Sequence, residues 1–440
     1  MQPSLKPHKS RYVFNHIHSF SRADGSHLDC LGLPFARGIA GARLETRHTL
    51  VTIFDPLIYK FHMKPAEKID TPNSEFRENQ MTPHLEPPAD SEAIRPEPSG
   101  LFVKNPVDFS VLKELEGQNI LGAGQFTFSQ VAELCKLAAV LEKIEVWPYH
   151  PLDGKIAVTA FFEASTRTRT SFESAIMRLA GKVISIADGK TTGQVKGESL
   201  ADIGEMFNAY ADVVVMRHTE TDAPEQILEN LRIPLINAGN GSGEHPTQAL
   251  ADWFALLKWA PRLAEHRQPG DLPLELGILG TPGSMRAVKS FLLMALHFKE
   301  HIGKVTVISE MADPFGEEVT AQLTAAGIEY EVSNDVREQL PDLDVIYMNS
   351  IAFLGDSYKA MDSRYKLTAE SPIKKSAVIL HPLARLDELD TSLDKTQHNL
   401  YFSQAHGAVF MRQALLMAVL GRLDALPPLD QLNNTTQPTK

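Results

Sequence analysis

The sequence predicts an α/β fold made of two doubly wound parallel-sheet domains, with the active site in the cleft between them. From about residue 115 onward, short continuous apolar runs alternate with amphipathic helical stretches, which is typical of parallel strands covered by helices on both faces. The alternation is interrupted at residues 261–273, which are rich in proline and charge, and then restarts. Clusters of Arg, His, Ser and Thr follow several apolar runs, where open α/β sheets bind ligands.

Each apolar run of four to seven residues is interpreted as a buried strand, because its length is too short for a helix. In the first domain the predicted strands are residues 156–162, 183–187, 213–216 and 234–237. In the second domain they are residues 274–279, 305–308, 328–332, 345–348 and 377–380. The predicted domains are residues 106–265 and 266–404, and a final helix within residues 405–427, with apolar residues on one face, is expected to return to the first domain.

Residues 1–105 differ in composition from the rest of the chain. Residues 1–62 hold eight lysines or arginines against four acidic residues, whereas the whole chain carries a formal charge of −12. Residues 63–106 are rich in Pro, Glu and Asp, which is typical of a flexible linker. We predict that residues 1–105 form an extension outside the folded domains, with Met63 and Met81 as alternative starts. The other interpretation is a docking arm for a partner.

Charge and composition exclude several classes of function. A net charge of −12 argues against general binding to nucleic acids or to anionic membranes. No apolar run is long enough to span a bilayer, and the first residues lack the continuous apolar core of a signal peptide. Cys30 and Cys135 provide neither a disulfide framework nor a zinc pattern. The sequence therefore predicts a cytoplasmic protein, in which any anionic substrate needs a local positive pocket.

The stretch Ser-Thr-Arg-Thr-Arg at residues 165–169 is the strongest candidate for such a pocket. It lies between the strand 156–162 and an amphipathic helix. The spacing of Thr170 and Glu173 predicts a capping box at the start of that helix, and Gly181 is predicted to end it. The first N–H groups of a helix are unpaired and carry partial positive charge, and guanidinium groups match phosphate oxygens. A solvated helix cap is the alternative interpretation.

Three further positions are predicted to lie at the same edge of the sheet. His245 and Gln248 are one turn apart at the start of a helix that begins with Pro246, and Arg217 ends the strand 213–216. A neutral histidine there can donate a hydrogen bond to a carbonyl oxygen. The alternatives are a histidine that caps its own helix and an arginine with a structural role. The polar loop 190–198 is either a carrier of a cation to the ligand or a solvated loop.

Together these motifs resemble the aspartate/ornithine transcarbamoylase family. The resemblance covers about residues 115–425 and depends on residues 165–169, Lys-Gly-Glu at 196–198, Met-Arg-His at 216–218, His-Pro-Thr-Gln at 245–248 and His-Pro-Leu-Ala-Arg-Leu-Asp-Glu at 381–388. The ornithine branch usually has cysteine in the place of Pro382, so the chain is more similar to the aspartate branch.

The resemblance implies a reaction and a set of partners. The carbamoyl group of carbamoyl phosphate would pass to the amine of L-aspartate in de novo pyrimidine biosynthesis, without a metal or another cofactor. The resemblance also implies a homotrimer with shared active sites. A companion regulatory or dihydroorotase-like subunit is a further partner that it allows.

The resemblance also assigns roles to individual residues. The phosphate would be held by Ser165, Thr166, Arg167 and Thr168. The carbonyl oxygen would be contacted by Arg217, His245 and Thr168, and the carbamoyl nitrogen by Gln248. Thr192 and Lys196 would reach into a neighbouring subunit's site and bind its carbamoyl phosphate. In the amino-acid half, the implied residues are Lys196, Arg286 on the aspartate carboxylate, and Leu383 with its backbone carbonyl near the amine. The catalytic set would be Arg167, Thr168, Arg217, His245 and Lys196.

The segment around residue 350 departs from the family pattern. Ser350 and Ala352 stand where the aspartate branch has an arginine and a glutamine that grip aspartate. Either another cation substitutes, with Lys359 and Arg364 as candidates, or the acceptor is a different amino compound. A third interpretation is an inactive transcarbamoylase-like subunit that serves assembly or regulation. The retention of the cationic and histidine positions favours an active enzyme that acts on aspartate.

Overall fold

A computed structural model of the chain describes residues 94–349 and 363–427. The first of its two sheets holds four parallel strands in the order β2-β1-β3-β4. These strands are β1 (Ile156–Phe161), β2 (Lys182–Ile186), β3 (Val213–His218) and β4 (Leu235–Asn240). Their apolar runs are short and β-branched, and each crossover that joins them contains a helix, as parallel pairing requires.

The second sheet holds five parallel strands in the order β7-β6-β5-β8-β9. They are β5 (Leu274–Leu279), β6 (Ile302–Ile308), β7 (Glu329–Ser333), β8 (Val345–Met348) and β9 (Val378–Leu380). All nine predicted strands are therefore present, with ends that shift by at most three residues. The predicted fold class of two doubly wound parallel sheets is confirmed.

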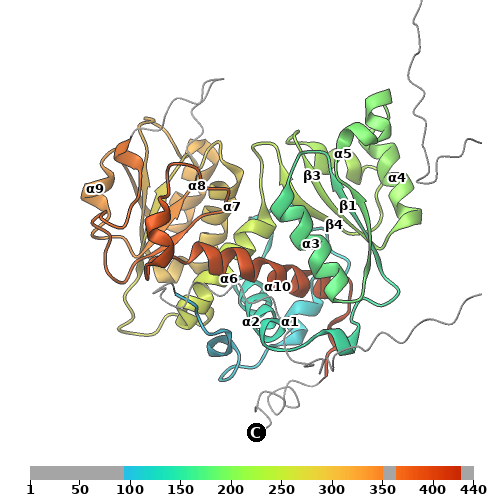
Figure 1. The fold of residues 1–440 in the computed structure, drawn as a ribbon, viewed down its shortest axis with the longest axis horizontal. Helices are drawn as coiled ribbons and strands as arrows, with labels where there is room; N and C mark the ends of the chain where they lie inside the picture. Colours follow the sequence, from blue (N-terminus) through green and yellow to red (C-terminus); the bar gives the residue numbers. More distant parts are fainter. Residues whose placement is uncertain (1–93, 350–362, 428–440) are drawn as a thin grey trace, which may run out of the picture. The chain divides into compact units, whose positions relative to one another are not determined.

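Helices cover the strands and connect them (Figure 1). Before and between the strands of the first sheet lie α1 (Phe109–Lys113), α2 (Phe128–Lys143), α3 (Thr166–Arg178), α4 (Leu200–Tyr210) and α5 (Ala223–Leu228), and α6 (Pro246–Trp259) follows β4. With the second sheet are α7 (Arg286–Ala295), α8 (Gly316–Ala326) and α9 (Val336–Gln339), and the last helix is α10 (Tyr401–Val419). No helix among the described residues is long and apolar enough to cross a membrane.

Each sheet has a point where the strand order reverses. In the first sheet β1 lies between β2 and β3, and in the second sheet β5 lies between β6 and β8. The connections that leave the two neighbouring strands there run to opposite faces of the sheet, which opens a crevice beyond the carboxyl ends of the strands. The segments that follow β1, β3 and β5 are therefore the places where this fold binds ligands.

Helix α10 differs from the prediction in both extent and character. The prediction placed the helix within residues 405–427 with one apolar face, but α10 spans Tyr401–Val419 and Leu423 lies in a separate 3₁₀ turn. Side chains around its whole circumference are buried, because α10 packs against α2, α3 and α6 (Figure 1). Even the polar residues Gln404, Arg412 and Gln413 are at most 3% exposed.

The folded part begins before residue 106, where the prediction placed the end of the extension. Residues Pro98–Leu101 form a 3₁₀ turn that buries Pro98 and Leu101 against α2. Helix α2 begins with a capping box, in which Thr127 and Gln130 are bonded reciprocally. The remainder of the predicted extension, residues 1–93, lies outside the described residues, and so do the two alternative starts.

Candidate active site

The first turn of α3 carries the predicted phosphate-binding residues. Ser165 is the N-cap in an extended conformation, its side chain makes no capping hydrogen bond, and Thr166 is the first helical residue. Thr168 is buried (7% exposed), whereas Thr166 and Arg167 are exposed. The N–H groups of this turn point away from the helix without helical partners, so hydroxyls, a guanidinium and backbone donors lie together at a positive helix end.

The predicted capping box at Thr170 and Glu173 is wrong, because α3 starts four residues earlier. The Thr170 hydroxyl donates to the Thr166 carbonyl at 2.7 Å. The Glu173 carboxylate accepts instead from Thr159, Ser185 and Arg169, at 3.0, 2.6 and 3.1 Å. Glu173 thereby ties α3 to the first sheet and occupies Arg169. No ion pair involves Arg167 among the described residues, which leaves this guanidinium available for an anion.

A carboxylate that the sequence analysis missed joins the two sheets. Glu163, two residues after β1, accepts from Arg217 at the end of β3, with Nη2 to Oε1 at 2.6 Å. Arg286, the first residue of α7, grips the same carboxylate with both terminal nitrogens, at 2.7 and 2.8 Å. Arg286 also donates to the Gly241 carbonyl at 2.9 Å. The switch points of both sheets therefore meet at Glu163.

The electrostatics of this cluster favour an ionised carboxylate. Burial by itself raises the pKa of Glu163, but hydrogen bonds and charge from Arg286 and Arg217 outweigh burial and bring the pKa below its usual value. Burial and the charge of Arg286 lower the pKa of Arg217, although it stays a cation. The Nε of Arg217 is buried and has no hydrogen-bond partner. That unused donor is suited to an oxygen of a ligand.

His245 is placed as the N-cap residue of α6 and is 4% exposed. Its backbone N–H donates to the Ser290 hydroxyl at 2.8 Å, and its Nδ1 lies 3.3 Å from the Thr247 hydroxyl. Burial, followed by the charges of Arg217, Arg286 and Arg412, holds the pKa of His245 well below its usual value. A neutral imidazole whose Nδ1 accepts from Thr247 carries its proton on Nε2 and can donate there.

Gln248 and Leu383 are each fixed by hydrogen bonds to buried groups. The Gln248 amide nitrogen donates to Asp252 at 2.7 Å, one turn further along α6. Leu383 has a left-handed backbone (φ 56°), and its N–H donates to His381 Nδ1 at 2.8 Å. The other ring nitrogen of His381 lies 2.9 Å from Glu388 Oε1, and both side chains are buried. The backbone N–H of Leu383 is thus held by a buried histidine and carboxylate pair.

The loop that contains Thr192 and Lys196 forms two 3₁₀ turns, Gly189–Thr191 and Gly193–Lys196. The Thr192 hydroxyl donates to the Gly189 carbonyl at 2.6 Å, and Lys196 is exposed. No hydrogen bond or ion pair within the described residues joins Lys196 to any residue of the first-sheet half of the site, so the single chain does not bring it together with them.

The segment predicted to distinguish aspartate from other acceptors contains Ser350, Ala352 and Lys359, and all three lie outside the described residues. Arg364, the other substitute cation, lies 2.7 Å from Glu310 and is half of an ion pair at the surface. Its side chain is 65% exposed, so the structure does not join it to the candidate site.

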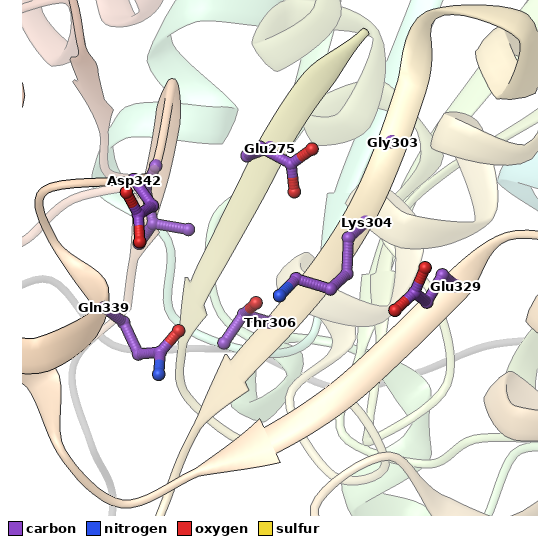
Figure 2. A pocket seen from close by; sticks show the side chains of 8 residues that line it. Glu275, Gly303, Lys304, Thr306, Glu329, Gln339 and Asp342 are labelled. Atoms are coloured by element: carbon purple, nitrogen blue, oxygen red, sulfur yellow. The ribbon is translucent and has the colours of Figure 1, made fainter.

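A pocket on the second sheet lies away from the predicted residues (Figure 2). Glu275, Gly303 and Glu329 lie within the first two residues of β5, β6 and β7, so the pocket is near the amino ends of these strands. Parallel sheets bind ligands at the opposite ends. Within residues 94–349 and 363–427, no group of three His, Cys, Asp or Glu side chains is placed to hold a metal ion.

Two family models match the chain and divide it as the two sheets do. Residues 118–258 match the carbamoyl-P binding domain of aspartate/ornithine carbamoyltransferase, and residues 274–419 match the Asp/Orn binding domain of the same family. The first match contains the predicted residues from Ser165 to Gln248, and the second contains Arg286 and Leu383.

Individual relatives agree with these matches. The chain is 35% identical over 311 residues to the aspartate carbamoyltransferase catalytic subunit of Pyrobaculum islandicum, which covers 69% of this chain and 98% of the relative. It is 39% identical over 276 residues to the aspartate carbamoyltransferase catalytic subunit of Aliivibrio fischeri, which covers 61% of this chain and 86% of the relative. Among solved structures, aspartate transcarbamoylase from Trypanosoma cruzi in complex with carbamoyl aspartate and phosphate is 28% identical. It matches with a TM-score of 0.62 and covers 72% of this chain and 100% of that one.

Proposed function

Because the chain belongs to the aspartate/ornithine carbamoyltransferase family, we propose that it transfers the carbamoyl group of carbamoyl phosphate to the amine of L-aspartate. The products are N-carbamoyl-L-aspartate and phosphate, which places the reaction in de novo pyrimidine biosynthesis. A set of donors at the first switch point carries the proposal. Among the described residues, Arg167 in the first turn of α3 has no ion pair and the buried Arg217 Nε has no hydrogen-bond partner, while His245 is neutral.

The phosphate of the substrate is assigned to the first turn of α3. Ser165, Thr166 and Thr168 supply hydroxyls, and the backbone N–H groups of the turn supply donors with the positive end of the helix dipole. Arg167 adds a guanidinium that can bind two oxygens at once. A doubly charged group is thus neutralised locally in a protein whose net charge is −12.

The carbonyl oxygen of the carbamoyl group is assigned to Arg217, His245 and Thr168. This oxygen gains charge when the tetrahedral intermediate forms, and donors that are already in place stabilise it without reorganisation. His245 is suited to this role as a neutral donor, because burial and nearby arginines keep a second proton off its ring. Gln248 is assigned to the carbamoyl nitrogen.

The nucleophile in this proposal is the substrate itself. The uncharged amine attacks the carbamoyl carbon, and the C–O bond to the phosphate group breaks with its electron pair on the phosphate oxygen. The proton lost by the amine nitrogen passes to the leaving phosphate. The Leu383 carbonyl is assigned a place beside the amine, where it accepts an N–H hydrogen bond and orients the lone pair. A large share of the rate acceleration comes from alignment of the two substrates.

The observations on the amine that accepts the carbamoyl group support two candidates. Relatives at 31–39% identity are named aspartate carbamoyltransferases, and Arg286 is assigned to the aspartate carboxylate. Ser350 and Ala352 replace two residues that grip aspartate in the family, and Arg286 is paired with Glu163. These two observations favour a second candidate, a carbamoyltransferase for another amino compound.

A screen of acceptor amines tests the proposal. Purified protein is incubated with carbamoyl phosphate and L-aspartate, L-ornithine or other amino compounds at millimolar concentration, and ureido product and phosphate are measured together. We expect both products with aspartate in equal amounts. Product with another amine alone establishes the second candidate, and phosphate release without any ureido product contradicts carbamoyl transfer.

We further propose a homotrimer in which Thr192 and Lys196 complete the site of a neighbouring subunit. The support is that Lys196 is exposed and that, among the described residues, it has no hydrogen bond or ion pair with the first-sheet residues of the site. Inactive Lys196→Ala and His245→Ala proteins, denatured and refolded together, should regain part of the activity, since some sites then contain both intact residues. Full inactivity of a mixture that assembles as a trimer would exclude shared sites.

The domain organisation is proposed with the same function. Residues 106–265, completed by the final helix, would bind carbamoyl phosphate, and residues 266–404 would bind the amino acid. The extension would be dispensable for the chemistry, since no helical or strand period persists in it. A chain without its first 80 residues should keep its turnover number. Loss of activity in a folded truncated protein would assign the extension a part in the site.

A further inference from the structure

A carboxylate behind the candidate site collects hydrogen bonds from three elements. Asp252 on α6 is fully buried (0% exposed). Its Oδ1 accepts from the side-chain amides of Gln248 on α6, at 2.7 Å, and Gln404 on α10, at 2.5 Å. Its Oδ2 accepts from the Tyr347 hydroxyl at the end of β8, at 2.9 Å. Three donors therefore fix the orientation of this carboxylate.

The carboxylate in turn fixes which end of Gln248 is available to a ligand. A side-chain amide has one donor end and one acceptor end, and an ionised carboxylate can only accept. The Gln248 nitrogen is therefore committed to Asp252, and its oxygen is the end left for the site. The other groups assigned to the carbamoyl group, Arg217, His245 and Thr168, are assigned as donors to its carbonyl oxygen, so Gln248 is the acceptor among them.

Burying a carboxylate costs free energy, so the presence of an aspartate at position 252 rather than a neutral residue calls for an explanation. Among the described residues Asp252 has no lysine or arginine within ion-pair distance. The buried Arg412 contributes charge, but its Nη1 donates to Ser171 at 2.6 Å. Burial raises the pKa of Asp252 to about 7, against the three hydrogen bonds that lower it. An asparagine would cost less to bury, but its NH₂ group could donate to Gln248 and let that amide turn around.

We propose that Asp252 is a positioning residue that makes the site selective for a carbamoyl group over an acyl group without N–H, by holding the Gln248 oxygen toward the ligand. The NH₂ of a carbamoyl group can donate to that oxygen, whereas the methyl of an acetyl group cannot. This inference rests on the proposed function and adds a determinant of substrate choice to it. Asp252 acts through Gln248 and does not touch the substrate.

The test compares two ligands that differ in this group alone. Calorimetry at pH 8, where Asp252 is ionised, measures the dissociation constants of carbamoyl phosphate and acetyl phosphate for the full chain. The unaltered protein should prefer carbamoyl phosphate. In Asp252→Asn that preference should fall by about tenfold, because Gln248 can now present its NH₂, while binding of acetyl phosphate changes less than about threefold.

Two comparisons separate this role from general loosening of the fold. Tyr347→Phe removes a hydrogen bond from the same carboxylate but leaves Gln248 its partner, so the preference should stay within about threefold of the unaltered protein. In a Gln248→Ala protein, adding Asp252→Asn should not change the preference further, since the group through which it acts is gone. Asp252→Ser is a second replacement in case the asparagine variant does not fold, and the same loss is expected.

The outcomes distinguish the inference from the function. An unchanged preference in folded Asp252→Asn or Asp252→Ser overturns the role of Asp252 and leaves carbamoyl transfer intact. Equal affinity of the unaltered protein for both ligands overturns it as well, since Gln248 then does not read the N–H. Binding of neither ligand by the unaltered protein overturns the inference together with the proposed function.

Discussion

The two halves of the candidate site differ in how their cations are used. In the half that follows the first sheet, Arg167 has no ion pair among the described residues, and the Nε of Arg217 has no hydrogen-bond partner. In the half that follows the second sheet, both terminal nitrogens of Arg286 donate to the Glu163 carboxylate. The first half is thus ready for an anion, whereas the second must share or release a cation that is already bound.

This difference has an energetic meaning. A bidentate pair between Arg286 and a half-buried Glu163 combines two charge-assisted hydrogen bonds. An acceptor carboxylate that takes Arg286 must compete with that pair, whereas the phosphate of carbamoyl phosphate displaces no carboxylate from Arg167. We therefore expect carbamoyl phosphate to bind in the absence of acceptor, and the acceptor to bind weakly unless carbamoyl phosphate is present.

The largest effect is expected where the first half is broken. Arg167→Ala should lower kcat/KM by roughly 30- to 1,000-fold, since one fixed cation at a reacting charged group contributes about 2–4 kcal/mol. Steady-state kinetics with both substrates varied measures the loss. Arg178→Ala removes the same charge from the exposed other end of α3 and should leave kcat/KM unchanged. Similar kinetics of the two variants would contradict the assignment of the phosphate to this turn.

The second half is tested through the carboxylate that holds it. Glu163→Gln removes the charge between Arg217 and Arg286, and should cost about 1–3 kcal/mol of folding free energy, because two partly buried cations lose their counter-charge. Chemical denaturation measures this cost. We expect KM for the acceptor to change more than the dissociation constant of carbamoyl phosphate, since Arg286 makes two of the three bonds to Glu163. The reverse order would mean that Glu163 serves the first half.

The pH dependence of the free energy of unfolding tests whether burial raises the pKa of Asp252. The folded-state pKa of Asp252, about 7, is above its usual value of 3.8. The folded state therefore holds a proton that the unfolded state has released, and the stability this contributes is present below pH 4 and lost as the pH rises through 7. Asp252→Asn lacks this loss. Between pH 5 and 8 its free energy of unfolding should gain roughly 2 kcal/mol relative to the unaltered protein. A constant difference across this range would contradict the raised pKa.

The smallest effect concerns the backbone beside both arginines. Gly239 has φ +117°, and a Cβ there would lie 3.1 Å from Arg286 Nε and 3.6 Å from Arg217 Nη1. Gly239→Ala should lower kcat/KM about tenfold or less, because the added carbon crowds the Arg286 guanidinium, whereas its contact with Arg217 is of ordinary length. Gly270→Ala is the matched control, with φ +98° and open space around the added carbon. Both variants should lose similar stability, about 1 kcal/mol, and equal losses of activity in both would show that backbone strain alone is responsible.

Sequence patterns predicted the frame of the site but misassigned one of its interactions. The spacing of Thr170 and Glu173 fits a capping box, yet Glu173 faces the sheet and accepts from Thr159 and Ser185. Spacing along a helix does not reveal which side chain a neighbouring strand will offer. Glu163 was missed for the same reason, although a charged residue between a buried strand and Ser165 was a visible signal.

The amino-acid sequence alone determined the nine strands, the helix that begins at Pro246 and the turn that carries Arg167, since each is encoded within about ten consecutive residues. Only the tertiary structure decided that Arg286 pairs with Glu163 and that Gln404 and Gln248 share Asp252. Arg286 and Glu163 are 123 residues apart in the chain, and Gln404 and Asp252 are 152 residues apart. Their contacts depend on how whole helices pack across two sheets, because local periodicity places a side chain on a face but does not specify what lies opposite.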